Sequence, residues 1–376
     1  MTDYSSTKRV ITRRGFFRRT AVVAGLLAAA GGGAACQQLS QIVGSRGPVK
    51  ITWAGQGGSY MEAVKKYLWE PFSKENNVEI EFVAAPTTVV LARLRAEKGA
   101  PSLDFLGTGE GVVVSMRAEG LVDKMDIAKV PNMANVLPTA RNDEGYPPQG
   151  AAIANVIYYN SEFVKTPPTG WADLWKPEFK GKVSYPDIQN TTGLHLLLMA
   201  AKLAQGDTSS NSGEKFVNDA AFKKMKDLQV NTYTIYGFQT AFDGMAALKS
   251  GEVWLHIDGL VGQTKTILNQ PNTPIKALVT AKEGIPNSPL TLAFVKGSKV
   301  PADMMNKLLN AHLSKDVAIG IADLSDFVPT LNIELPPNLA SVLPKPSAML
   351  RSDWKYIADN RPAWTERWNK EILVAK

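Results

Sequence analysis

The chain has 376 residues, of which 44 % are hydrophobic and 20 % are charged. This is the composition of a globular protein with enough chain for two domains. The formal charge of +7 comes largely from the N-terminus, since residues 1–36 hold six basic residues and one acid, and 36 basic and 34 acidic residues follow. A charge this close to balance gives no support to a nucleic-acid partner, which needs a basic face on the folded part.

Residues 1–36 form a predicted export signal. Arg13 and Arg14 precede an apolar run of small residues, Ala21–Ala30, and this order of regions is typical of a cleaved signal of the twin-arginine type. The run is too short to span a membrane. Cys36 is the only cysteine, which excludes an internal disulfide. It is either lipid-modified, anchoring the mature chain to a membrane, or lies beside an ordinary signal-peptidase site. In both cases we expect a periplasmic protein.

The first part of the mature chain alternates strands with helices. A polar linker at residues 37–47 comes first. The apolar periodicity then predicts strand 49–53, a helix with Tyr60, Val64 and Leu68 on one face, strand 78–83, helix 88–97 and strand 103–107. This βαβαβ order predicts a parallel sheet with right-handed crossovers.

Two later strands are predicted to cross between two lobes. Gly150–Tyr159 leaves the first lobe, and Leu290–Val295 returns to it. The other elements that we expect are strands 182–185, 252–257 and 275–280 and helices 194–204, 216–225, 241–249, 301–314, 316–323 and 354–368.

The predicted fold class is therefore α/β with two lobes. We assign residues 48–150 and 288–376 to lobe 1 and residues 151–287 to lobe 2, each lobe a mixed sheet flanked by helices. Crossing strands between two such lobes form a hinge, and small ligands bind in the cleft that the strand-end loops line. Closure of the lobes around a ligand is the motion that this design predicts.

One stretch carries a family resemblance. The sequence Trp171-Ala-Asp-Leu-Trp175, followed by Lys176-Pro-Glu-Phe-Lys-Gly-Lys-Val183, resembles a signature of bacterial extracellular solute-binding proteins of ABC transporters, in the group of spermidine/putrescine, thiamine and ferric-iron binders. Weaker echoes are Gly55–Tyr60, Lys282-Glu-Gly284 and Phe327–Thr330. The resemblance implies a type II periplasmic binding protein fold. It also implies a monomer without a cofactor that performs no chemistry and delivers a small-molecule ligand to ABC permease subunits.

Candidate ligand-binding residues lie at the predicted strand ends, which face the cleft in a parallel sheet. Glu110 and Asp258 each stand beside a glycine and are candidate acceptors for a cationic group. The polar residues before helix 194–204 can hold an anionic or polar group with free backbone N–H groups. The complete set of candidates is Gln56, Gly58, Ser59, Tyr60, Thr108, Glu110, Gln189, Asn190, Thr191, Thr192, Gln239 and Asp258.

The favoured ligand is a polyamine or a similar organic cation, and several alternatives stay open. An anionic or other small solute (thiamine, an amino acid, a phosphonate or iron) would suit the same fold. No histidine spacing indicates a metal site, and the pair Tyr158-Tyr159 falls in a crossing strand, where the two side chains point to different faces. From another class, an exported α/β hydrolase would use Ser59, although the sequence around it lacks a nucleophile elbow. A receptor that signals rather than transports is a further alternative.

Overall fold

The computed structural model describes residues 47–97, 99–141, 144–237, 243–260, 267–268 and 270–373. Contacts group residues 48–376 into one compact unit. The predicted export signal and Cys36 lie outside the described residues, as does Gln239. Within the described ranges, no helix combines the length and the apolar character that crossing a bilayer requires.

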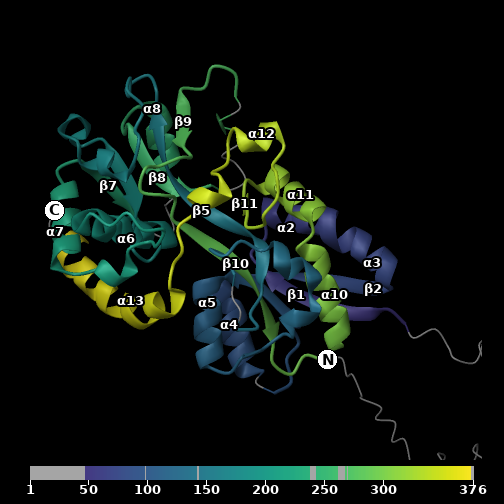
Figure 1. The fold of residues 1–376 in the computed structure, drawn as a ribbon. Helices are drawn as coiled ribbons and strands as arrows, with labels where there is room; N and C mark the ends of the chain where they lie inside the picture. The colour runs from purple at the N-terminus through teal and green to yellow at the C-terminus, as the bar shows by residue number, and fades with distance from the viewer. Residues whose placement is uncertain are drawn as a thin grey trace, which may run out of the picture. The chain divides into compact units, whose positions relative to one another are not determined.

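The strands form a mixed sheet (Figure 1). They are β1 (Val49–Gly55), β2 (Val78–Ala84), β3 (Phe105–Gly109), β4 (Val122–Asp123), β5 (Pro148–Asn160), β6 (Val183–Pro186), β7 (Thr232–Tyr236), β8 (Leu255–Gly259), β9 (Ile275–Leu278), β10 (Asn287–Val295) and β11 (Val328–Pro329). The path of hydrogen-bonded neighbours is β2-β1-β3-β10-β5-β8-β6-β7. β1 is parallel to β2 and β3 as predicted, whereas β10 is antiparallel to both β3 and β5.

Strand β5 connects the two parts of this sheet. Its first half pairs with β10 and β11, and its second half pairs with β8 and β9. The prediction that Gly150–Tyr159 is a crossing strand is consistent with this pairing, and β10 is the second strand beside it. One continuous strand therefore links the early elements of the chain to the later ones.

The helices cover the sheet on its faces (Figure 1). The longer ones are α2 (Ser59–Val64), α3 (Glu70–Asn76), α4 (Thr87–Ala96), α5 (Glu110–Ala118), α6 (Thr191–Gln205), α7 (Asp219–Leu228), α8 (Asp243–Ser250), α10 (Ala302–His312), α11 (Lys315–Ser325) and α13 (Trp354–Trp368). Shorter helical segments include η1 (Lys65–Trp69), η4 (Trp171–Trp175), α12 (Pro337–Ala340) and η9 (Asn369–Leu373).

Helix α5 was missed by the sequence reasoning, which expected only a turn after the strand at 103–107. The strand instead runs to Gly109, and the helix begins at Glu110. Two glycines and a run of β-branched residues, Val112–Val114, obscure the helical pattern because both residue types have low helix propensity. α6 begins three residues earlier than predicted, at Thr191, because Asn190 caps it.

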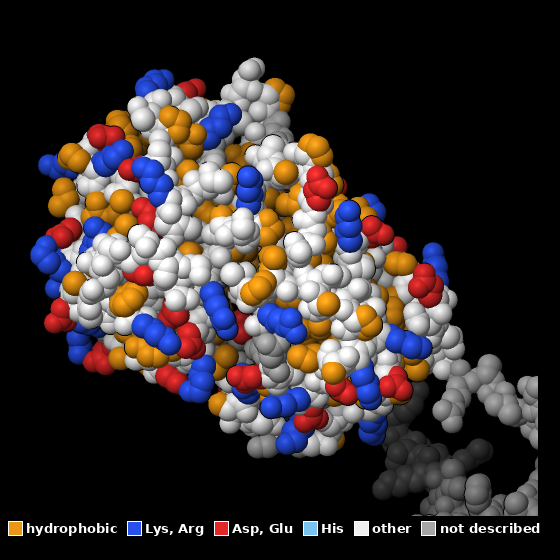
Figure 2. Space-filling model, viewed as in Figure 1, with side chains coloured by type: hydrophobic (Ala, Val, Ile, Leu, Met, Phe, Trp, Pro, Cys, Tyr) orange, Lys and Arg blue, Asp and Glu red, His pale blue; other side chains and the backbone are white. Residues whose placement is uncertain are grey.

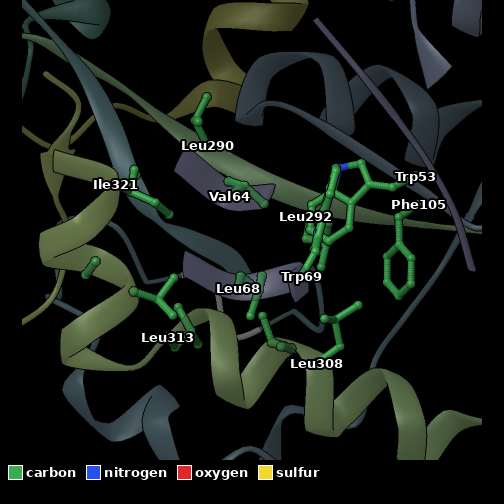
Figure 3. Close-up of a cluster of buried hydrophobic side chains, with 14 of the residues drawn as sticks. Trp53, Val64, Leu68, Trp69, Phe105, Leu290, Leu292, Leu308, Leu313 and Ile321 are labelled. Carbon is green, nitrogen blue, oxygen red and sulfur yellow. The ribbon is translucent and has the colours of Figure 1, made fainter. Parts of the chain in front are cut away.

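An aromatic core lies under the early strands (Figure 3). The ring centroid of Trp53 lies 5.3 Å from that of Trp69 and 5.5 Å from that of Phe105. Leu308 of α10 and Leu313, the residue that follows this helix, belong to the same buried cluster. Burial of each side chain of this size stabilises the folded state by about 1.5–3 kcal/mol. This cluster therefore holds β1 and β3 in place, and α5 follows directly after β3.

A second core joins α6 to the C-terminal helix. Trp354, Trp364 and Trp368 of α13 are buried in one cluster with residues of α6, α7 and β6, and Figure 1 shows α13 running beside α6 and α7 toward α5. The Nε1 atom of Trp368 donates to the Asp187 carboxylate at 3.1 Å. The predicted lobe boundaries stay a prediction; α13, which they place in lobe 1, shares this core with residues of the predicted lobe 2.

Candidate functional site

A cavity of about 530 Å³ lies where the start of α5, the start of α6 and one face of α13 meet. We call it the α5–α6–α13 cavity. Its lining residues are Leu91, Gly109, Glu110, Gly111, Val112, Ser115, Thr191, Ser288, Trp354, Ile357, Ala358, Arg361, Pro362 and Thr365. Segments far apart in the sequence thus contribute to one small-molecule-sized space, which is the usual form of a ligand site.

The first turn of α5 forms one wall of the cavity. β3 ends at Gly109, which is the N-cap residue and supplies no side-chain cap. A helix start of this kind leaves backbone N–H groups for a ligand and carries a partial positive charge. The carboxylate of Glu110 stands in the same turn, so this wall offers both N–H donors and one anionic acceptor.

The start of α6 forms a second wall and is fixed to the crossing strand. The Asn190 side chain accepts from the Thr192 backbone N–H at 2.8 Å, which caps the helix. The Thr192 hydroxyl donates to Oδ1 of Asn155 on β5 at 2.7 Å, and the amide nitrogen of Asn155 lies 2.5 Å from Nδ1 of His195. These contacts hold Thr191 at the cavity.

Helix α13 supplies the third wall and the cation of the cavity. Nη2 of Arg361 donates to the carbonyl oxygens of Ile188 and Gln189 at 3.0 and 2.8 Å, so α13 is tied to the loop that enters α6. Burial lowers the pKa of Arg361, and the Asp187 carboxylate opposes that effect. The buried ring of Trp354 packs edge-on against His195, with centroids 5.7 Å apart.

The histidine behind the cavity is held neutral. Burial lowers the pKa of His195 to about 3, and the positive charge of Arg361 adds to the effect. The ring of His195 is therefore neutral at physiological pH and adds no charge behind the cavity. Among the described lining residues, Arg361 is the positive side chain.

A family profile described as "Bacterial extracellular solute-binding protein" matches residues 68–355, which is more than half of the chain. The chain belongs to the bacterial extracellular solute-binding proteins.

Similar proteins agree with this family. This solute-binding protein is 25 % identical to the spermidine/putrescine-binding periplasmic protein of Salmonella typhimurium, over 85 % of this chain and 91 % of that one. It is 26 % identical to a putative 2-aminoethylphosphonate-binding periplasmic protein of Salmonella typhi, over 80 % of this chain and 86 % of that one. A solved structure of an ABC transporter protein from Clostridium perfringens has a TM-score of 0.72 at 23 % identity and covers 86 % of this chain and 99 % of that one.

The family confirms the predicted class of function. The chain acts as the solute-binding component of an ABC import system, outside the cytoplasm, and not as an enzyme. The predicted type II periplasmic binding protein fold is confirmed by the structural similarity. The hydrolase alternative at Ser59 is therefore set aside.

Two of the predicted ligand-binding residues line the α5–α6–α13 cavity, Glu110 and Thr191. Their neighbours have other roles: Thr108 is buried on β3, Gln189 is exposed, and Thr192 is a buried residue that binds Asn155. With the Asn190 cap, these residues shape the helix start on which Thr191 sits. Their part in ligand binding stays a prediction.

The first predicted loop, at Gln56–Tyr60, lies apart from this cavity. Gln56 and Gly58 are exposed and Ser59 is half-buried, and Gly58 lines a different cavity of about 600 Å³ beside α2, η1 and β2. Tyr60 is a core residue: its ring stacks on Phe327 with centroids 4.9 Å apart, and its hydroxyl donates to Gln149 at 2.6 Å. A role for the Tyr60 hydroxyl in binding would require that buried hydrogen bond to break.

Asp258 is not among the residues that line either cavity. One carboxylate oxygen accepts from the Gly259 backbone N–H at 2.7 Å, and the other lies 3.8 Å from Nε2 of the buried His256. The sequence analysis named Glu110 and Asp258 as acceptors for a cationic group. Only Glu110 lines the α5–α6–α13 cavity.

The family signature has a structural role here. Glu283 accepts from the backbone N–H groups of Trp171 and Ala172 at 2.9 and 3.4 Å, and the indole nitrogen of Trp171 donates to the Gly284 carbonyl at 3.0 Å. The two motifs that carried the resemblance, one beginning at Trp171 and one at Lys282, therefore bind each other. Neither lines the cavity.

The sequence reasoning missed the lining residues Ser288, Trp354, Arg361 and Thr365. α13 was correctly predicted as an amphipathic helix, but its apolar face gives no sign of which polar residues lie beside α6. Only Arg361 offered a signal, as a basic residue next to Pro362 in a Trp-rich helix. Within the described part of the chain, no group of His, Cys, Asp or Glu side chains could hold a metal ion.

Proposed function

We propose that this protein captures a small organic solute carrying an amino group in the α5–α6–α13 cavity and presents it to its permease from the periplasm. The supporting observation is that two walls from distant parts of the chain, one bearing Glu110 and one bearing Thr191, meet at a cavity of about 530 Å³. That volume suits a small solute. The solutes in the names of two relatives, spermidine/putrescine and 2-aminoethylphosphonate, all carry an alkylamine group. We assign Glu110 as the acceptor for that group.

The proposed binding motion is closure of the two lobes about β5 and β10. Solute that bridges α5 and α6 stabilises the closed arrangement, because it contacts walls from both sides of the crossing strands. A polyamine is one solute of this kind, and the relatives named for it favour it. A polyamine would recruit acids beyond the single carboxylate of the described lining.

Glu110→Gln tests the role of the carboxylate. We expect it to weaken binding of amine solutes by about 1.5–3 kcal/mol, the scale of a hydrogen bond to a charged group, in titration calorimetry with putrescine, spermidine and 2-aminoethylphosphonate. The matched control is Glu81→Gln, which removes the same charge from an exposed position on β2. If Glu110→Gln binds every amine as tightly as the wild type, the assignment of Glu110 is refuted.

A further inference from the structure

We propose that Arg361 is a specificity-determining residue that binds an oxyanion of the solute, a carboxylate or a phosphonate. The inference rests on the proposed function and deepens it: the solute then carries an amino group and an oxyanion together. The residues that carry it are Arg361 on α13 and the first turns of α5 and α6.

Arg361 is only partly used by the protein. Its Nη2 atom donates to the carbonyl oxygens of Ile188 and Gln189. A guanidinium carries five N–H groups, and the Nε and Nη1 groups have no hydrogen-bond partner among the described residues. The side chain is half-buried and lines the cavity, so a solute in the cavity lies beside a guanidinium with donors to spare.

The charge of Arg361 feels the carboxylate of Asp187 but forms no direct ion pair among the described residues. No carboxylate in the described ranges forms an ion pair with it, and the carboxylate oxygens of nearby Asp187 already accept from the Gln189 backbone N–H and from Trp368. A half-buried cation without a direct ion pair is less stable than one that an anion contacts. A neutral donor would be enough to bind the two carbonyl groups of Ile188 and Gln189. We infer that the positive charge of Arg361 serves to bind an anionic solute.

The surrounding backbone reinforces this positive potential. α5 and α6, of 9 and 15 residues, both begin at the cavity, and each helix start carries a partial positive charge. Placing a cation beside a helix start is unfavourable unless an anion joins them. In addition, Nε1 of the lining residue Trp354 is a buried donor without a partner among the described residues.

With Glu110 on α5 as the acceptor for ammonium, the lining offers one group of each sign. The solute class that matches is a short aminocarboxylate or aminophosphonate. Carboxylate and phosphonate are bound by the same guanidinium chemistry, so the experiment must distinguish them.

The test is titration calorimetry on the full chain with four probes: 4-aminobutyrate, 2-aminoethylphosphonate, putrescine and butyrate. The variants are Arg361→Gln, Arg361→Lys and the control Arg351→Gln, which removes the same charge from an exposed residue before α13. We expect Arg361→Gln to weaken binding of the better amino-oxyanion probe by roughly 10- to 100-fold, the range of a hydrogen bond to a charged group. Putrescine affinity should stay or rise, and Arg361→Lys should recover part of the loss.

The remaining outcomes separate the two proposals. Equal losses for putrescine and the amino-oxyanion probe in Arg361→Gln, or an equal loss in Arg351→Gln, overturn the inference. If the wild type binds putrescine but neither 4-aminobutyrate nor 2-aminoethylphosphonate, the inference is also overturned, and the proposed function stands. If butyrate binds as tightly as 4-aminobutyrate and Arg361→Gln abolishes both, the amino group of the proposed function is refuted and the role of Arg361 stands. No binding of any probe at millimolar concentration overturns both.

Discussion

Gly193 near the start of α6 is a position where a single methyl group should disturb the cavity. A Cβ atom there would lie 2.2 Å from the carbonyl oxygen of Asp187 and 2.3 Å from that of Pro186. Because both neighbours are backbone atoms at the end of β6, α6 must move by roughly 1 Å to relieve the overlap. Overpacking of this kind costs about 1–3 kcal/mol, and the higher helix propensity of alanine returns at most about 1 kcal/mol.

We therefore expect Gly193→Ala to lower the free energy of unfolding by up to about 2 kcal/mol, the difference between these two effects. Urea denaturation followed by tryptophan fluorescence measures this directly. Solute affinity should fall as well, because the shift carries Thr191 away from the cavity that it lines. Gly57→Ala is the control, since a Cβ atom at that exposed glycine meets nothing within 4 Å. A Gly193→Ala variant as stable as the Gly57→Ala control would refute the packing argument.

Two further predictions concern residues outside the cavity. Burial lowers the pKa of His312 to about 3. Below its ordinary pKa of about 6.5 the unfolded chain therefore binds a proton at His312 and the folded chain does not, so stability is lost as pH falls from about 6.5 toward 3, by up to about 1.4 kcal/mol per pH unit. The variant His312→Leu should reduce that slope in urea titrations at several pH values. An unchanged slope would show that His312 does not contribute. Glu283→Ala removes the acceptor for two N–H groups at the start of η4 and should cost about 0.5–2 kcal/mol of stability, as the loss of a helix cap does, with solute affinity unchanged; a loss of affinity at full stability would contradict its structural role.

Much of the fold was predictable because it depends on local periodicity. The alternating residues of β1 and β2, the apolar face of α6 and the spacing of tryptophans in α13 each specify an element without tertiary information. β5 was recognisable from its length and position. α5 was missed because glycine and β-branched residues weaken the helical pattern, and its stability comes instead from packing: Gly111 lets the ring of Trp354 approach to 3.0 Å of where a Cβ atom would lie.

The candidate site was predictable only in part, for a related reason. Glu110 and Thr191 follow strands, and strand ends in an α/β sheet meet at one edge. Arg361 lies in the C-terminal helix, more than 160 residues after Thr191 in the sequence, and reaches the cavity through the packing of Trp364 and Trp368 against the core of α6. No sequence pattern encodes that juxtaposition. Tyr60 shows the opposite situation: its strand-end position suggested a ligand contact, whereas its ring packs in the core, and its part in binding stays a prediction.

The most direct test of the central claim is to fill the cavity. Ser288 is a half-buried residue of β10 that lines the α5–α6–α13 cavity, and Gly57 lines the other cavity, beside α2 and β2. We would measure binding of putrescine, 4-aminobutyrate and 2-aminoethylphosphonate by calorimetry to Ser288→Trp and Gly57→Trp, after checking that both variants unfold cooperatively. The account predicts that Ser288→Trp no longer binds the solute that the wild-type protein binds, and that Gly57→Trp still binds it. Retained binding in Ser288→Trp, with loss in Gly57→Trp, would contradict the account and place the solute in the other cavity.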